Sequence, residues 1–156
     1  MITSLRNKES KKTNKIRTDI PGLEDTIKQF FSAKTKEQIN LNLKKIFEFL
    51  FNEIEKIEIS FRSTLANMVT EETGNMFWIT DLSVFANPNK YNKTIELIDK
   101  EVKRSKEDFI LHFKNKYSNP YPPAWILAEI LPLGVMTNIY SNLKNKRVKK
   151  AISQRF

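Results

Sequence analysis

Residues 52–67 read NEIEKIEISFRSTLAN. Apolar residues recur through this stretch, and on both sides of it, at intervals of three or four, which is the period of one face of an α-helix. The interval holds over seven positions: Ile46, Leu50, Ile54, Ile57, Phe61, Leu65 and Met68. We therefore predict one long helix over about residues 36–71, with these seven side chains in the core.

The rest of the chain also favours helices. It holds only three glycines, and it lacks the Asn-Gly or Asp-Gly pairs and the alternating runs that are typical of β-hairpins. We expect an all-α bundle of about five helices, with an irregular connector over residues 75–92. Besides the long helix, the predicted helices cover residues 23–32, 91–104, 106–117 and 123–142.

Local signals set the expected ends of these helices. Gly74 is predicted to terminate the long helix as its C′ residue, and Ser105 with Asp108 to open residues 106–117 as a capping box. Pro132 and Gly134 are expected to kink the last helix.

The net charge of +9 is concentrated at the two ends of the chain. Residues 1–19 hold six Lys or Arg against two acids, and residues 144–156 hold six against none, whereas the 124 residues between them hold fifteen bases and sixteen acids. Such clusters attract polyanions, RNA above all, although they can equally be solvated tails that aid solubility. We expect a flexible basic arm over 1–19 and a single helical domain over 20–156.

Composition excludes several kinds of site. The chain has no cysteine and one histidine, so it offers no disulfide, no thiol nucleophile and little for a transition metal, and we expect no metal and no cofactor. The longest apolar run, residues 124–136, is too short to span a membrane and contains Glu129 and Pro132. The prediction is a soluble, cytoplasmic protein without a membrane partner.

Three charged residues interrupt the apolar side of the long predicted helix. At about 100° per residue, Glu55, Glu58 and Arg62 fall inside the apolar arc rather than opposite it. A buried charge without a partner costs several kcal/mol, so these residues are either paired or functional. Glu58 and Arg62 stand at i and i+4, which suits an ion pair; alternatively Arg62 lines a pocket and binds a phosphate. Glu129, the one acid within residues 124–133, is a candidate partner for Arg62.

The chain resembles the Abi-like family of bacterial abortive-infection proteins, which defend against phage. The similarity extends over about residues 40–156, and it rests on a series of short pieces in the same order and spacing. These pieces are residues 54–63, Gly74, Trp78, Phe85, residues 109–113, Tyr117, residues 122–125, Glu129, Gly134 and residues 140–143.

The resemblance implies an all-helical fold of the HEPN type, whose members are thought to be metal-independent ribonucleases. It also implies RNA as a partner, and a homodimer or second chain that completes the site. In the family an arginine is followed at short helical spacing by a histidine, which can move a proton near neutral pH. Arg62 matches that arginine as the candidate catalytic or phosphate-binding residue, with Glu55 and Glu58 in support.

This sequence departs from the family pattern in two places. Asn67 and its next two neighbours stand where the histidine would be, and asparagine can bind RNA but cannot exchange a proton at this pH. Family members continue past the segment that matches residues 151–156, and a second Arg-Asn…His motif lies in that continuation. We therefore expect a truncated or diverged member, which leaves nuclease activity open.

Two further functions compete with that interpretation. The chain can be a non-catalytic RNA- or protein-binding module that acts through its basic ends, or a gene remnant whose exposed apolar surface makes it poorly soluble or dimeric. His112 is a candidate RNA-binding residue, but a lone histidine at the margin of an apolar face more often has a structural role. The aromatic residues expected in the core are Trp78, Phe85, Trp125 and Tyr140.

Overall fold

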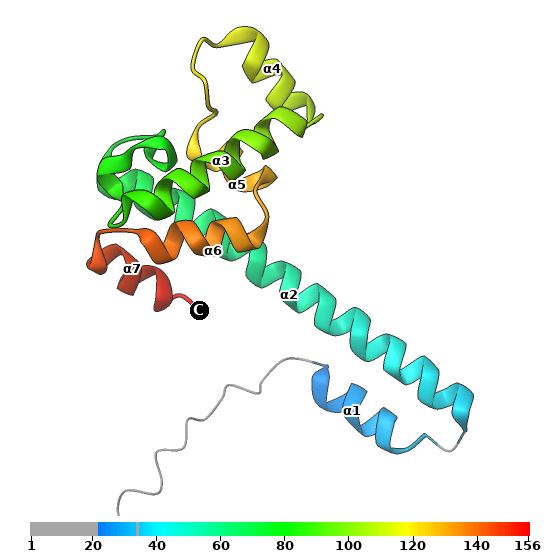
Figure 1. Cartoon of the computed structure of the whole chain (residues 1–156). Helices are drawn as coiled ribbons and strands as arrows, with labels where there is room; N and C mark the ends of the chain where they lie inside the picture. Colours follow the sequence, from blue (N-terminus) through cyan, green and yellow to red (C-terminus); the bar gives the residue numbers. More distant parts are fainter. Residues whose placement is uncertain (1–21, 34) are drawn as a thin grey trace, which may run out of the picture. The chain divides into compact units, whose positions relative to one another are not determined.

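The computed structural model describes residues 22–33 and 35–156, so the basic arm expected over 1–19 lies outside the described residues. Within the described part the chain is all-α, with seven α-helices, two short 3-10 turns and no strand (Figure 1). The contacts of the described residues gather in two compact units, which divide between Glu53 and Ile54, and each unit is described by itself.

The first unit contains helix α1 (Leu23–Phe31) and the beginning of α2 (Lys36–Thr73). A capping box precedes α2: the Gln38 backbone N–H donates to Thr35 Oγ1, and the Thr35 N–H donates to Gln38 Oε1, each at 3.2 Å. The two helices are joined by a hydrogen bond from Asn42 Nδ2 to the Gln29 carbonyl, at 2.8 Å.

The second unit holds the rest of α2 and all the later elements. The 3-10 turns η1 (Trp78–Thr80) and η2 (Leu82–Val84) lead to the helices α3 (Pro88–Arg104), α4 (Asp108–Lys116), α5 (Ala124–Ile130), α6 (Leu133–Asn142) and α7 (Lys146–Ser153). Helix α3 packs against α6 and α5 (Figure 1).

The core of this unit gathers apolar residues from α2, the 3-10 turns and four of the later helices. Its fully buried members include Leu65, Trp78, Ile98, Met136 and Ile152. Helix α2 therefore contributes to a core only in its last third, where Leu65, Ala66 and Val69 are buried.

The long helix was predicted correctly, but its core stripe was not. Gly74 ends the helix as expected, with a φ of 62° and its N–H bonded to the Thr70 carbonyl at 2.8 Å. The predicted stripe is buried only around Leu65: Ile54 and Ile57 are 58% and 59% exposed, and Leu50 is also exposed. Periodicity identifies the apolar face of a helix, but it does not say whether another element covers that face.

Several predicted boundaries were wrong for identifiable reasons. Helix α3 begins at Pro88 rather than residue 91, because the side chain of Asn87 accepts from the Lys90 N–H at 3.0 Å and proline suits the first turn. The helix expected over 123–142 is two helices, since its Pro132 ends the first of them. Helix α7 had not been predicted at all.

One smaller prediction fails, and another is confirmed only in part. The capping box expected from Ser105 and Asp108 is absent from α4, where Ser105 Oγ instead accepts from the Glu107 N–H at 3.4 Å. Of the four expected core aromatics, Trp78 and Phe85 are buried and Tyr140 is half-buried, but Trp125 is 46% exposed.

One buried polar residue ties α6 to the start of α3. Asn142 Oδ1 accepts from the backbone N–H of Asn87 at 2.9 Å, and its Nδ2 donates to the carbonyl of the same residue at 3.0 Å. Asn87 in turn caps α3. The buried amide therefore fixes the point at which the connector becomes helix.

Candidate functional site

Arg62 is largely buried and is held by partners from two helices. Its side chain is 14% exposed, and that of Glu58 is 32% exposed. The Arg62 Nε donates to Glu58 Oε1 at 3.0 Å, and Nη2 donates to the same oxygen. On its other side, Nη1 donates to the main-chain carbonyls of Ala128 and Leu131.

These two carbonyls explain why a side chain with several N–H donors stands at position 62. In a continuous helix the Ala128 carbonyl would accept from the N–H four residues later, but that residue is Pro132, which has none. The Leu131 carbonyl lies just past the end of α5, where helix carbonyls lose their own donors. Arg62 supplies both missing donors and so caps α5 from α2.

This arrangement limits what Arg62 can offer to a phosphate. A guanidinium has five N–H donors, and in the described part of the chain four of Arg62's are taken by Glu58, Ala128 and Leu131. One N–H on Nη2 remains for another acceptor. Bidentate binding of a phosphate would require Arg62 to give up its hydrogen bonds to the α5 carbonyls or to Glu58.

The other candidate residues take no part in the contacts of Arg62 with Glu58, Ala128 and Leu131. Glu55 is exposed, as are its apolar neighbours Ile54 and Ile59, so the side of the helix on which it lies is not covered there. Asn67 is exposed, with its Nδ2 donating to Ser63 Oγ at 3.4 Å. His112 is exposed on α4, and Glu129 is exposed on α5. Arg62 contacts main-chain atoms on either side of Glu129, and the expected ion pair with its carboxylate is not among the interactions of the described residues.

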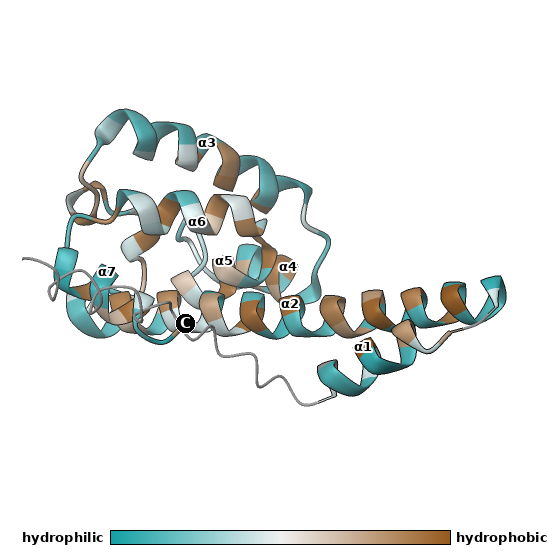
Figure 2. Ribbon diagram, turned by 90° about the horizontal axis from the view of Figure 1, so that it is seen from below, coloured by the Kyte–Doolittle hydropathy of each residue, from teal (hydrophilic) through white to brown (hydrophobic). Residues whose placement is uncertain are grey.

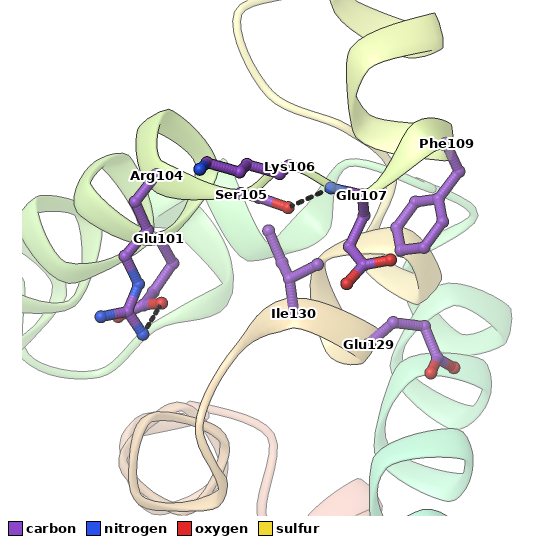
Figure 3. A pocket seen from close by; sticks show the side chains of 8 residues that line it. All are labelled: Glu101, Arg104, Ser105, Lys106, Glu107, Phe109, Glu129 and Ile130. Carbon is purple, nitrogen blue, oxygen red and sulfur yellow. Dashed lines mark hydrogen bonds and ion pairs between the residues drawn. The ribbon is translucent and has the colours of Figure 1, made fainter.

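Glu129 lines a different hollow, shown in Figure 3, between the α3–α4 junction and α5. Its volume is about 610 Å³. In this hollow Arg104 Nη2 pairs with Glu101 Oε2 at 2.5 Å, so the guanidinium of Arg104 is already engaged by a carboxylate. The hollow combines three carboxylates with two bases, which suits a phosphate poorly; it is lined by Glu101, Arg104, Ser105, Lys106, Glu107, Phe109, Glu129 and Ile130.

A second hollow, of about 430 Å³, is almost wholly apolar. It lies between α2, α6 and α7, and Phe61 forms edge-on contacts there with Tyr140 and Phe156, at ring separations of 5.8 and 5.9 Å. Exposed parts of Ile54 and Ile57 form one wall. This groove offers apolar contact but few groups that could bind an anion.

Within the basic segment at residues 144–156, Lys146–Ser153 form the amphipathic helix α7. Asn145 caps α7 by accepting from the backbone N–H groups of Arg147 and Val148, at 2.9 and 3.2 Å. Val148 and Ile152 are buried in the core, which leaves Lys146, Arg147 and Lys150 exposed. The signal that was missed is Asn145 as an N-cap before two apolar residues four apart.

The largest pKa shift belongs to a structural contact. Tyr121 donates its hydroxyl to Asp99 Oδ1 at 2.7 Å, and this bond raises the pKa of Tyr121 to about 12. The same bond, together with Lys103, lowers the pKa of Asp99. The pair joins α3 to the segment before α5. Near neutral pH Tyr121 keeps its proton and Asp99 stays ionised, so the pair does not exchange a proton there.

Two further observations bear on the class of protein. The described residues contain no cluster of three or more His, Asp or Glu side chains that could hold a metal ion. Among the helices of the described part, none is long and apolar enough to cross a membrane.

Comparison with known proteins gives one match. A family model described as Abi-like protein covers residues 23–156. No curated protein and no solved structure matches the chain.

Proposed function

This chain belongs to the Abi-like protein family, and we propose that it acts in bacterial antiphage defence by binding RNA on the exposed face of α7. The observation that carries the proposal is the fixed orientation of that helix: Val148 and Ile152 anchor it, so Lys146, Arg147 and Lys150 all point to solvent. Cations on an ordered helix can neutralise neighbouring phosphates and release counterions.

Arg62 takes a supporting part in this proposal. With four of its N–H donors used inside the protein, it holds α2 and α5 together, and its remaining N–H can reach at most one phosphate oxygen. A HEPN-type ribonuclease site would also need a proton-transferring group beside it. Asn67 cannot serve as one, so we expect the chain to bind RNA without cleaving it unless a second chain completes the site.

The direct test is RNA binding by the purified chain as a function of salt. Replacing Lys146, Arg147 and Lys150 together by Gln should weaken binding and reduce the slope of log affinity against log salt by about 2, at roughly 0.7 per lost contact with single-stranded RNA. A matched control replaces Lys90, Lys93 and Lys100 of α3, which are also exposed. Equal losses in both variants would show that net charge, and not α7, is responsible.

Cleavage is a second candidate activity, because the family resemblance favours it. Incubation of RNA with the chain in the presence of a chelator should leave the RNA intact. Robust cleavage that Arg62→Lys abolishes, while the variant remains folded and still binds RNA, would overturn the non-catalytic interpretation and restore Arg62 as a catalytic residue.

A further inference from the structure

A cavity lies at the start of α7, next to the basic side chains proposed to bind RNA. Its volume is about 370 Å³, which is within the roughly 300–1,000 Å³ typical of small-molecule sites. The end of α2, the connector before α3 and the start of α7 all line it. It combines carboxylate side chains with an apolar part, formed by Val69, Val84, Leu143 and Val148. Such a mixture suits a ligand with apolar faces and a polar edge.

Main-chain pairing fixes one wall of this cavity. The connector lies antiparallel beside the link between α6 and α7 (Figure 1). The Lys144 N–H donates to the Val84 carbonyl, and the Ala86 N–H donates to the Asn142 carbonyl, both at 2.9 Å. Because this wall is held by the protein itself, a ligand does not have to order it on binding.

Two carboxylates of the cavity are oriented by hydrogen bonds. Glu72 Oε1 accepts from Asn145 Nδ2 at 2.7 Å, so the end of α2 is joined to the residue that caps α7. Asp81 accepts from the Ser83 N–H at 2.9 Å and from Asn75 Nδ2 at 3.3 Å. These bonds, those from Ser83 above all, lower the pKa of Asp81, so it remains an ionised acceptor near neutral pH.

Glu72 has the larger spare capacity to accept further hydrogen bonds. A carboxylate has about four lone-pair positions. The interactions of the described residues use one of them on Glu72 and two on Asp81. Glu72 is also exposed, whereas Asp81 is half-buried and caps η2. Glu72 is therefore the carboxylate that a ligand can reach without disturbing the connector.

The charges around the cavity favour a ligand with two unlike ends. Glu72 and Asp81 oppose a bare anion. Lys144 also lines the cavity, and the exposed Lys146 and Arg147 follow it, so a bare cation is opposed as well. In Figure 2 hydrophilic residues interrupt the hydrophobic ones along α7. A nucleotide meets both conditions, because its base is neutral and its phosphate is anionic.

Among the four RNA bases, guanine matches a carboxylate best. It carries two adjacent N–H donors, on N1 and on its amino group, which can pair with both oxygens of Glu72. Adenine and cytosine have a ring acceptor next to their amino group, and uracil has a carbonyl on each side of its one N–H. Each of these would bring an acceptor against the carboxylate, which is itself only an acceptor. The side chains of Val69, Val84 and Val148 can contact the flat faces of the base.

We propose that this cavity binds a guanine base of the RNA that α7 holds, and that Glu72 is the residue that recognises it. The inference rests on the proposed RNA binding by α7, and it adds a base preference to phosphate contacts that carry no sequence information themselves. Lys144 is then the nearest cation to the phosphate that adjoins the bound base.

The test compares short single-stranded RNAs of equal length, all uridine except for one central guanosine, adenosine or cytidine, with an all-uridine RNA as reference. The full chain should bind the guanosine RNA at least about fivefold more tightly than the others, the low end of the discrimination given by a bidentate contact. Glu72→Gln should remove this preference, because it replaces one acceptor oxygen by an N–H donor. Glu71→Gln is the matched control and should keep the preference, since it removes the same charge at an exposed neighbour that does not line the cavity.

Two further measurements separate this site from RNA binding by α7. The triple Gln variant of α7 should weaken the binding of every RNA and keep the ratio between them. Calorimetry with guanosine monophosphate, compared with uridine monophosphate, probes the cavity alone. Selective binding of the guanosine nucleotide that Glu72→Gln abolishes would support the guanine site even if no RNA bound, and it would then assign the free nucleotide as its source.

Two results would overturn the guanine site. One is the absence of any guanine preference, both among the RNAs and between the two mononucleotides. The other is a guanine preference that Glu72→Gln leaves intact, because the base would then be recognised elsewhere on the protein. A preference seen with RNA and not with the mononucleotide, and lost in Glu72→Gln, would support the site and identify RNA as its ligand.

Discussion

At the scale of single residues, Arg62 links the sequence to the fold by replacing a missing hydrogen-bond donor. Pro132 ends α5 and deprives the Ala128 carbonyl of its usual partner; Arg62 restores it from a helix 66 residues earlier in the chain. Glu58 balances the charge of the guanidinium. A buried cation so placed is compatible with a purely structural role.

We predict that Arg62→Ala lowers the free energy of unfolding by about 3 kcal/mol, because it leaves Glu58 and two carbonyls without a partner. The same change at the exposed Arg147 should have little effect. When Pro132→Ala is also present, residue 132 has its own N–H, so the cost of Arg62→Ala should fall by about 1 kcal/mol. Strictly additive effects in denaturant unfolding would contradict the proposed exchange of donors.

A second residue-scale prediction concerns Tyr121. Its pKa is raised to about 12, so the hydrogen bond to Asp99 stabilises the fold fully below pH 10, the ordinary tyrosine value, and this contribution is lost as the pH rises through about 12. At the acid end the sign is reversed: the pKa of Asp99 is lowered, so its contribution is present above the ordinary aspartate value and is lost as the pH falls below it.

Ultraviolet titration of the tyrosines can check this. One of the four tyrosines should ionise near 12, the value for Tyr121, and Asp99→Asn should move that ionisation back toward the ordinary range. The pKa of Tyr91 is also raised, by burial and by Asp81, and this shift should not respond to the change. Ionisation near 12 that persists in Asp99→Asn would assign the shift of Tyr121 to burial instead.

At the scale of elements, most helices were predicted from local signals, whereas α7 was missed and the packing of the helices could not be predicted. The period of α2 and its end at Gly74 follow from the spacing and type of neighbouring residues. The all-α class follows from the same local patterns. Burial depends on what the rest of the chain brings alongside, and this is why Ile57 and Trp125 were wrongly expected in a core. Of the contacts of Arg62, the ion pair with Glu58 was predictable, because Glu58 lies one turn away in sequence. The contacts with the main-chain carbonyls at the end of α5 were not, because those carbonyls carry no side-chain signal.

The unequal burial of α2 can be measured. Leu65→Ala removes a fully buried side chain and should cost about 2–5 kcal/mol of unfolding free energy. Ile57→Ala, on the same predicted stripe but largely exposed, should cost less than about 1 kcal/mol. Similar losses at both positions would mean that something covers Ile57 in solution.

The link between α6 and α3 gives another element-scale prediction. Asn142→Ala should cost about 1–3 kcal/mol, because it leaves the N–H of Asn87 without its partner and removes one of two donors from the Asn87 carbonyl, which keeps the Tyr91 N–H. Hydrogen exchange should then accelerate in the first turn of α3, where Asn87 is the cap. Unchanged protection there would show that the amide pairing does not hold the start of the helix.

At the scale of the whole molecule, charge and family membership point in the same direction. The positive ends of the sequence predicted an affinity for polyanions, and the structure shows that one of these ends is a helix with a fixed polar face. The corresponding defence phenotype is testable in cells: phage plating on cells that produce the chain should be reduced, and the triple Gln variant of α7 should lose that protection while the α3 control keeps it.

The most direct test of the central claim is to map where RNA touches the protein. Ultraviolet cross-linking of the full chain to RNA, followed by mass spectrometry of the peptides, should place cross-links within residues 144–156, with or without others in residues 1–19. Cross-links confined to α2 around Arg62 and Asn67, with none on α7, would contradict the proposal and favour a phosphate site at the buried arginine.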